Sequence, residues 1–266
     1  GSTMTALTRK EELKNLLERL NSGEATEKVK REAQELINSI SAKELSEAEQ
    51  ELINDGLEET ELRHLCTAHI EAMAEELKEL KADVPVGHPL STLISEHEEI
   101  LKILERLDKV NSEIQKLDDF DPDNPLFDEL KNIGSKLLDT EKHHTREEET
   151  LFPEVDKSGV TGPTRIMRME HDDLWPHKER INEMAENADE IDFEDFKREI
   201  KEHADYVVVT LRDHIFKENN ILYPTAKDVI EESQWEEIKS KSDEIGYCSF
   251  TPAAELNNIL FARLNN

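Results

Sequence analysis

The sequence predicts an all-α protein in which an up-down-up-down four-helix bundle follows a smaller N-terminal helical domain. Charged residues make up 36% of the 266 positions and aromatic residues 5%, and only eight glycines occur, a composition typical of a mostly helical chain. Long amphipathic segments alternate with short polar connections, which implies that consecutive helices are antiparallel neighbours. Two prolines and a glycine within residues 84–89 separate the two parts.

Residues 8–84 are predicted to form the N-terminal domain, a set of shorter helices that ends with one over about residues 58–81. Apolar residues recur there at the three- and four-residue spacing of a helix face. Gly23 and the pair Asp55-Gly56 interrupt this spacing and mark turns.

Residues 85–228 are predicted to form the bundle. Its four long helical patterns cover about residues 89–117, 125–150, 163–186 and 192–221. Pro89 and Pro163 suit the first turns of their helices, where a missing N–H costs nothing. The remaining segment, residues 229–266, is predicted to add a short helix around Trp235 that packs on the bundle, and a weak helix or disordered tail after Pro252.

The two other prolines at helix boundaries, Pro153 and Pro224, come near the ends of the second and fourth patterns. Because proline disfavours a helical conformation in the residue before it, both are expected to end their helices.

A two-part motif occurs twice in the bundle. Each copy has a glutamate–histidine pair on one helix, and a histidine and a glutamate four positions apart on the next. The first copy comprises Glu96, His97, His143 and Glu147, and the second Glu170, His171, His214 and Glu218. The interval between the two histidines is 46 positions in the first copy and 43 in the second. Any one histidine could be an ordinary surface or core residue, but a duplicated set favours a metal site.

Residues four apart share a helix face, so each histidine–glutamate pair can aim an imidazole and a carboxylate at one point. A carboxylate inside a bundle is costly unless it is paired or binds a metal. The predicted ligands are His97, His143, Glu147, His171, His214 and Glu218. Four imidazoles and two carboxylates fit a di-iron or di-manganese centre better than zinc, which usually takes four ligands.

These motifs resemble the hemerythrin-like, or HHE cation-binding, domain over about residues 85–228. The resemblance implies an up-and-down bundle that holds two non-haem irons, with the four histidines as terminal ligands and the two glutamates as bridges. A bridging oxo or hydroxo group would be compatible with this set, and manganese or zinc could replace iron in a purified sample. The N-terminal block resembles an uncharacterised helical domain that precedes hemerythrin-like domains in many prokaryotic proteins.

The sequence departs from oxygen-carrying hemerythrins on the third helix. Those proteins place a second histidine one turn after the first, where this chain has Trp175, followed by Pro176, which favours a kink. One iron would then lack a nitrogen ligand or take a substitute. The candidates near the motifs in sequence are His88, His144, Glu170 and His177. His203, three helical turns before His214, is expected to be packed or hydrogen bonded, and His64 and His69 to contact neighbouring helices.

The net charge and the cysteine content indicate which binding partners and which cellular compartment to expect. A formal net charge of −30 makes nucleic acid a poor partner, because binding phosphates needs clustered lysine and arginine. No apolar run approaches the length of a membrane span. The two cysteines, Cys66 and Cys248, form no disulfide framework, so a reducing cytoplasm is expected.

Several functions are compatible with these motifs. The leading hypothesis is a di-iron protein that binds or senses a diatomic gas, oxygen or nitric oxide, and reports it to a signalling partner or within a homodimer through the N-terminal domain. The alternative is an enzyme that reduces oxygen, peroxide or nitric oxide. Repair of iron centres ranks third, because the repair proteins carry an N-terminal cysteine pair that this chain lacks. Iron storage or buffering, or a metal that is only structural, ranks fourth.

Overall fold

The computed structural model describes residues 80–256 and, before them, residues 11, 12, 15, 16, 19, 28, 31, 32 and 54–56. The chain divides into two compact units, Gly1–Glu79 and Leu80–Asn266. The predicted turn at Gly23, Cys66, and both His64 and His69 lie outside the described residues, as do most of the helices predicted before residue 80. The predicted turn at Asp55-Gly56 is present, and Gly56 has a positive φ of 92°.

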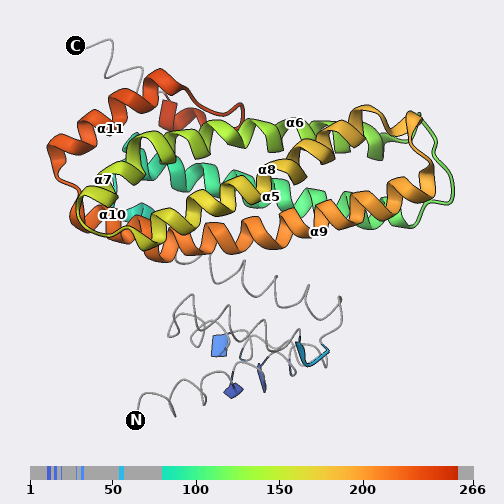
Figure 1. Ribbon diagram of the computed structural model, residues 1–266, viewed down its shortest axis with the longest axis horizontal. Coiled ribbons are helices and arrows are strands. Elements are labelled where there is room, and N and C mark those ends of the chain that lie inside the picture. Colours follow the sequence, from blue (N-terminus) through green and yellow to red (C-terminus); the bar gives the residue numbers. More distant parts are fainter. Residues whose placement is uncertain are drawn as a thin grey trace. The chain divides into compact units, whose positions relative to one another are not determined.

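The second unit is built on four long helices that lie side by side (Figure 1). They are α5 (Pro89–Gln115), α6 (Pro125–Arg146), α8 (Gly162–Glu186) and α9 (Phe193–Lys217). Helices α5 and α8 each pack against both α6 and α9. Short links join consecutive helices at opposite ends of the unit, so the predicted up-down-up-down bundle is confirmed.

The bundle core consists of apolar residues that recur at helical spacing in the sequence. Leu104 and Leu107 of α5, Ile133 of α6 and Leu211 of α9 are all fully buried, and such burial is the main favourable term in folding. Helix α5 starts at Pro89 and α8 reaches Pro163 at its second residue, as expected. Helix α8 stays helical through Pro176.

Two prolines do not end their helices as predicted. After α6 and α9 the chain continues into the π-helical turns η1 (Glu147–Leu151) and η3 (Glu218–Leu222), and then into α7 (Phe152–Lys157) and α10 (Tyr223–Val229). Pro153 and Pro224 lie in the first turns of α7 and α10. The wider turn accommodates a proline, which removes an N–H and clashes with the carbonyl four residues earlier in an α-helix.

The C-terminal part packs on one end of the bundle. Helix α11 (Glu232–Ile245) contacts α5, α6 and η1, and buries Trp235 and Ile238. The following segment is anchored by Glu255, whose buried carboxylate accepts hydrogen bonds from the Gly87 N–H at 2.6 Å and the Ser91 hydroxyl at 2.7 Å. Residues 253–256 are helical, and those after 256 lie outside the described part. A short 3-10 turn, η2 (Ala188–Glu190), precedes α9.

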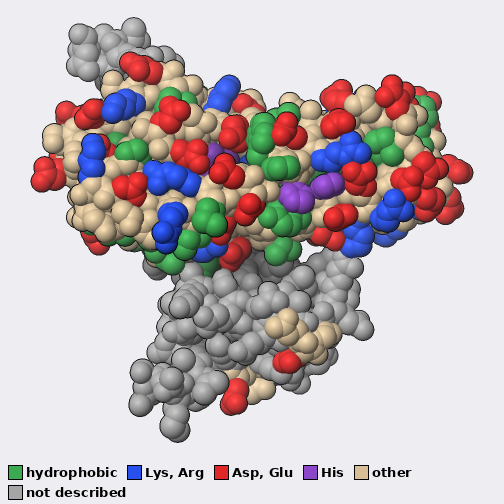
Figure 2. All heavy atoms as spheres, in the orientation of Figure 1, with side chains coloured by type: hydrophobic (Ala, Val, Ile, Leu, Met, Phe, Trp, Pro, Cys, Tyr) green, Lys and Arg blue, Asp and Glu red, His purple; other side chains and the backbone are tan. Residues whose placement is uncertain are grey.

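Acidic side chains are spread over the bundle face seen in Figure 2, with lysine and arginine between them. This face therefore has no large basic patch that could hold a polyanion. None of the described helices combines the length and apolarity needed to cross a bilayer.

The contact between α6 and α8 at Gly134 gives a first testable prediction. A Cβ at Gly134 would lie 3.0 Å from the Cα of Asn182. The Gly134→Ala variant is expected to lose about 1 kcal/mol of stability, because the steric cost outweighs the gain in helix propensity. Urea unfolding followed by tryptophan fluorescence measures this loss in the bundle, since both tryptophans, Trp175 and Trp235, lie after residue 80.

The matched control is Gly162→Ala at the first residue of α8. No atom lies within 4 Å of the added Cβ there, and the backbone needs no glycine. This variant should be as stable as the wild type or slightly more stable. Equal stability of both variants would show that α6 and α8 can separate without cost.

Candidate metal centre

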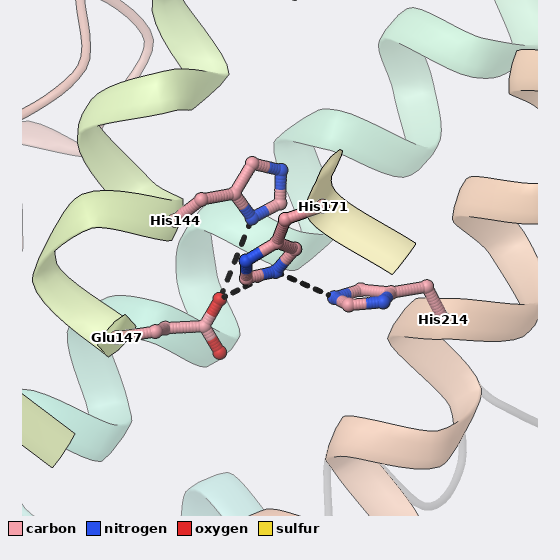
Figure 3. A group of neighbouring side chains, drawn as sticks. All are labelled: His144, Glu147, His171 and His214. Carbon is pink, nitrogen blue, oxygen red and sulfur yellow. Dashed lines mark hydrogen bonds and ion pairs between the residues drawn. The ribbon is translucent and has the colours of Figure 1, made fainter. Parts of the chain in front are cut away.

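All six predicted ligands converge in the buried interior of the bundle, together with His144 from the candidate set. They form two buried groups of possible metal ligands, whose ligand atoms lie within 4.8 Å of one another in each group. Cluster A consists of His97, His143, Glu147 and Glu218, and cluster B of His144, Glu147, His171 and His214. Glu147 belongs to both. In Figure 3 the side chains of cluster B point toward one another from α6, η1, α8 and α9.

The inner atoms of the clusters are in close contact. In cluster A, Nε2 of His143 lies 3.2 Å from Oε1 of Glu147, and Nε2 of His97 lies 3.5 Å from Oε1 of Glu218. In cluster B, Nε2 of His171 lies 3.7 Å from Oε1 of Glu147. A contact between the clusters joins Nε2 of His214 to Oε1 of Glu218 at 2.7 Å.

The outer nitrogens of the histidines on α5 and α8 are held by residues that follow the two glutamates. Nδ1 of His97 lies 2.8 Å from the amide oxygen of Asn219, and Nδ1 of His171 lies 3.2 Å from a carboxylate oxygen of Glu148. Asn219 follows Glu218 and Glu148 follows Glu147, so the internal repeat extends to these partners.

The histidines of α6 and α9 are held in the same way by the glutamates that precede the first histidine of each motif. Nδ1 of His143 lies 3.0 Å from Glu96, and Nδ1 of His214 lies 2.9 Å from Glu170. An ionised carboxylate only accepts hydrogen bonds, so Nδ1 carries the proton and Nε2 presents its lone pair to the centre. Histidines that bind metals are usually oriented in this manner.

This arrangement places lone pairs against lone pairs unless a cation lies between them. Nε2 of His171 and Nε2 of His214 are 3.0 Å apart. Within the described residues, the buried atoms Nε2 of His143, Oε1 of Glu147 and both carboxylate oxygens of Glu218 have no hydrogen-bond partner. The close contacts that these atoms make with one another and with neighbouring ligands do not have the angles of a hydrogen bond. Unpartnered buried polar atoms are costly, and a metal ion would satisfy them, so the residues fit the group.

Burial also favours the neutral imidazoles that a metal requires. It lowers the pKa of His97 to about 4 and the pKa of His214 well below its ordinary value. His143 differs. Burial lowers its pKa, but Glu147 and Glu96 outweigh burial and raise it. A metal ion in cluster A competes with protonation of this ring, so its affinity should increase with pH.

The π-helical turns begin at the two glutamates that face the centre, Glu147 and Glu218. Such turns are rare and often occur at functional sites. The aromatic residue after each turn stacks on the first histidine of a motif: Tyr223 on His97 with ring centroids 5.2 Å apart, and Phe152 on His171 at 6.0 Å. The buried Tyr223 hydroxyl donates to Oε2 of Glu147 at 3.0 Å.

The other residues that the sequence offered as substitute ligands lie elsewhere in the bundle. His88 caps α5, accepting a hydrogen bond from the Leu90 N–H at 3.0 Å. Glu170 holds the outer nitrogen of His214 and pairs with Lys217. His177 lies outside both clusters and pairs with His203, with their Nδ1 atoms 2.8 Å apart, so the expected hydrogen bond of His203 is present. Only His144 of these candidates joins a cluster.

Sequence reasoning missed the roles of Glu96, Asn219 and Lys178. The glutamate before the first histidine of each motif was a usable signal, because it occurs in both copies. No such signal marked Lys178, which is 1% exposed and lies 3.0 Å from Nε2 of His144. Burial lowers the pKa of Lys178 to about 8.

The family model described as the hemerythrin HHE cation binding domain matches residues 88–226. The chain belongs to this family. A family of unknown function, DUF438, matches residues 13–79. No curated protein matches the chain.

The hemerythrin HHE match covers both clusters and ends before α11. Yet the segment after α11 touches the centre indirectly, because the Thr251 hydroxyl donates to Glu96 at 2.8 Å. Glu96 also holds His143. This hemerythrin-like domain therefore has a C-terminal addition that supports one of the predicted ligands.

Proposed function

We propose that this hemerythrin-like domain holds two iron ions, one in cluster A and one in cluster B, and binds a diatomic molecule, oxygen or nitric oxide. The observation that carries the proposal is that two groups of inward-facing imidazoles share the carboxylate of Glu147. A shared carboxylate can bridge two ions. Imidazole together with carboxylate suits non-haem iron.

The surroundings support a small ligand. The six predicted ligands are at most 5% exposed, and His97, His143 and Glu147 are at most 1% exposed. A buried centre of this kind excludes bulky substrates and excludes bulk water. Iron held by these residues would supply the coordination chemistry that binds a diatomic molecule.

The test uses protein purified without oxygen and loaded with ferrous iron. Absorption spectra are recorded before and after addition of oxygen or nitric oxide, and again after the gas is removed. We expect a spectral change that depends on the gas and reverses on its removal, and no change in zinc-loaded protein. An iron-loaded protein whose spectrum responds to neither gas would refute gas binding but not metal binding.

One observation favours a second function, reduction of oxygen, peroxide or nitric oxide by an external electron donor. The Tyr223 hydroxyl lies 3.0 Å from Glu147 and 3.2 Å from Nε2 of His97. Burial raises the pKa of Tyr223 well above its ordinary value, so the phenol keeps a proton next to the centre. Turnover with an added donor that falls in Tyr223→Phe while gas binding persists would support the enzyme. Reversible adducts without turnover would exclude it.

A further inference from the structure

Three polar side chains meet in the interior between α6 and α8, next to cluster B. They are Thr140, His144 and Lys178, and each is at most 2% exposed. Nζ of Lys178 lies 2.7 Å from the hydroxyl of Thr140 and 3.0 Å from Nε2 of His144. Burying an amine, an imidazole and a hydroxyl is costly unless they are hydrogen bonded, as these three are to one another.

The other half of the internal repeat has no such group. Matching His171 to His97 and His214 to His143 gives the equivalent positions by counting along each helix. The equivalents of Lys178, Thr140 and His144 are Leu104, Leu211 and Ile215. All three are fully buried and apolar. The bundle can thus fill this space with hydrocarbon, and the half next to cluster B departs from that solution.

The imidazole of His144 faces cluster B. Its Nδ1 lies 3.5 Å from Oε1 of Glu147, and its ring centroid lies 3.9 Å from that of His171. Among the described residues, Nδ1 of His144 has no hydrogen-bond partner. Figure 3 shows this nitrogen directed at the shared carboxylate. Trp175, one helical turn after His171 on α8, has no atom that ligates a metal.

We propose that His144 is the third histidine ligand, through Nδ1, of the metal ion held by His171 and His214. The inference rests on the proposed two-metal centre and makes that centre unsymmetrical, with three imidazoles in cluster B and two in cluster A.

Lys178 is the positioning residue for this ligand. Its Nζ contacts Nε2 of His144 on the side of the ring away from the cluster and donates to the Thr140 hydroxyl. These contacts fix the ring so that Nδ1 faces Glu147.

The test is an anaerobic titration of the metal-free protein with Co²⁺ or Fe²⁺, which gives the affinity of each equivalent. In His144→Ile, which copies the other half of the repeat, one equivalent should bind as in the wild type. The second should bind at least about tenfold more weakly, as expected for loss of a ligand or its support. His177→Ala, which removes a histidine of α8 outside the clusters, should match the wild type.

Unchanged affinities for both equivalents in His144→Ile would overturn the inference and leave the two-metal centre intact. A wild-type protein that binds no metal would instead refute the proposed function. If the single variant does not fold, His144→Ile combined with Lys178→Leu copies two of the apolar equivalents and removes the amine that has lost its imidazole partner.

Ligation by His144 can also be tested in the wild-type protein. Ligating imidazoles of the Co²⁺ protein give paramagnetically shifted, exchangeable N–H signals in proton NMR. We expect five signals, one for each histidine of clusters A and B. Four signals would show that His144 does not ligate.

Discussion

The Glu147→Gln variant is expected to lose both metal ions of the proposed centre. Oε1 of Glu147 lies 3.2 Å from Nε2 of His143 in cluster A and 3.7 Å from Nε2 of His171 in cluster B. Glutamine keeps the size of the side chain and an oxygen for the Tyr223 hydroxyl, but it has no charge with which to bridge two cations. Elemental analysis of protein purified without oxygen should fall from about two metals per chain to well below one.

The control for this variant is Glu149→Gln. It makes the same chemical change two residues away, in the same π-helical turn, at an exposed side chain. Its metal content should equal that of the wild type. His143→Ala and Glu218→Ala each remove a member of cluster A and should lower metal content, with the loss greatest for that cluster. A folded Glu147→Gln protein with full metal content would exclude Glu147 as the shared ligand.

The Glu96→Ala variant is expected to lose about 3–5 kcal/mol of stability, the usual cost of removing one partner from a buried ion pair. Glu96 is fully buried and accepts hydrogen bonds from Nη1 of Arg146 at 2.8 Å and from the Thr251 hydroxyl at 2.8 Å. Arg146 is 2% exposed and, among the described residues, pairs with no carboxylate other than Glu96. Urea unfolding of the metal-free protein, followed by tryptophan fluorescence, measures the loss.

The control is Glu99→Ala on the same helix. Its ion pair with Lys102 lies at the surface, where such pairs contribute little, so stability should change by less than about 1 kcal/mol. If Glu96→Ala were no less stable than Glu99→Ala, the buried network would not support the bundle.

The same network predicts a pH dependence. Burial raises the pKa of Glu96, but Arg146 and His143 outweigh burial and hold this pKa well below the ordinary value of 4.5. A carboxyl whose pKa is lower in the folded than in the unfolded state stabilises the fold above its unfolded pKa, and loses this effect as pH falls. The stability difference between wild type and Glu96→Ala should therefore be largest near neutral pH and shrink below about pH 4.5. A constant difference across this range would contradict the ion pair.

The bundle was predictable because its signals are local. Prolines at helix starts, polar links and apolar residues at helical spacing each specify one element, and Pro89 and Pro163 stand where the sequence placed them. The π-helical turns were not predictable from spacing alone, since four-residue spacing suggests a continuous α-helix. For that reason Pro153 and Pro224 were wrongly expected to end their helices.

The clusters were predictable to the extent that they repeat. The duplicated histidines and glutamates pointed to six residues that the structure brings together, and their role as ligands stays a prediction. His144 could not be placed in the same way. Adjacent residues on an α-helix are about 100° apart, so His144 should face away from His143. It reaches cluster B because α8 packs on that side of α6 and Lys178 holds its ring. A lysine in an amphipathic pattern normally indicates solvent, which concealed this contact.

A crystal structure of the iron-loaded protein, with diffraction recorded at the iron absorption edge, tests the two-metal centre most directly. We expect two anomalous peaks in each molecule, one between His97 and His143 and one between His171 and His214, both next to Glu147. No peak at these histidines, or a single peak at one cluster in fully loaded protein, would contradict a two-metal centre.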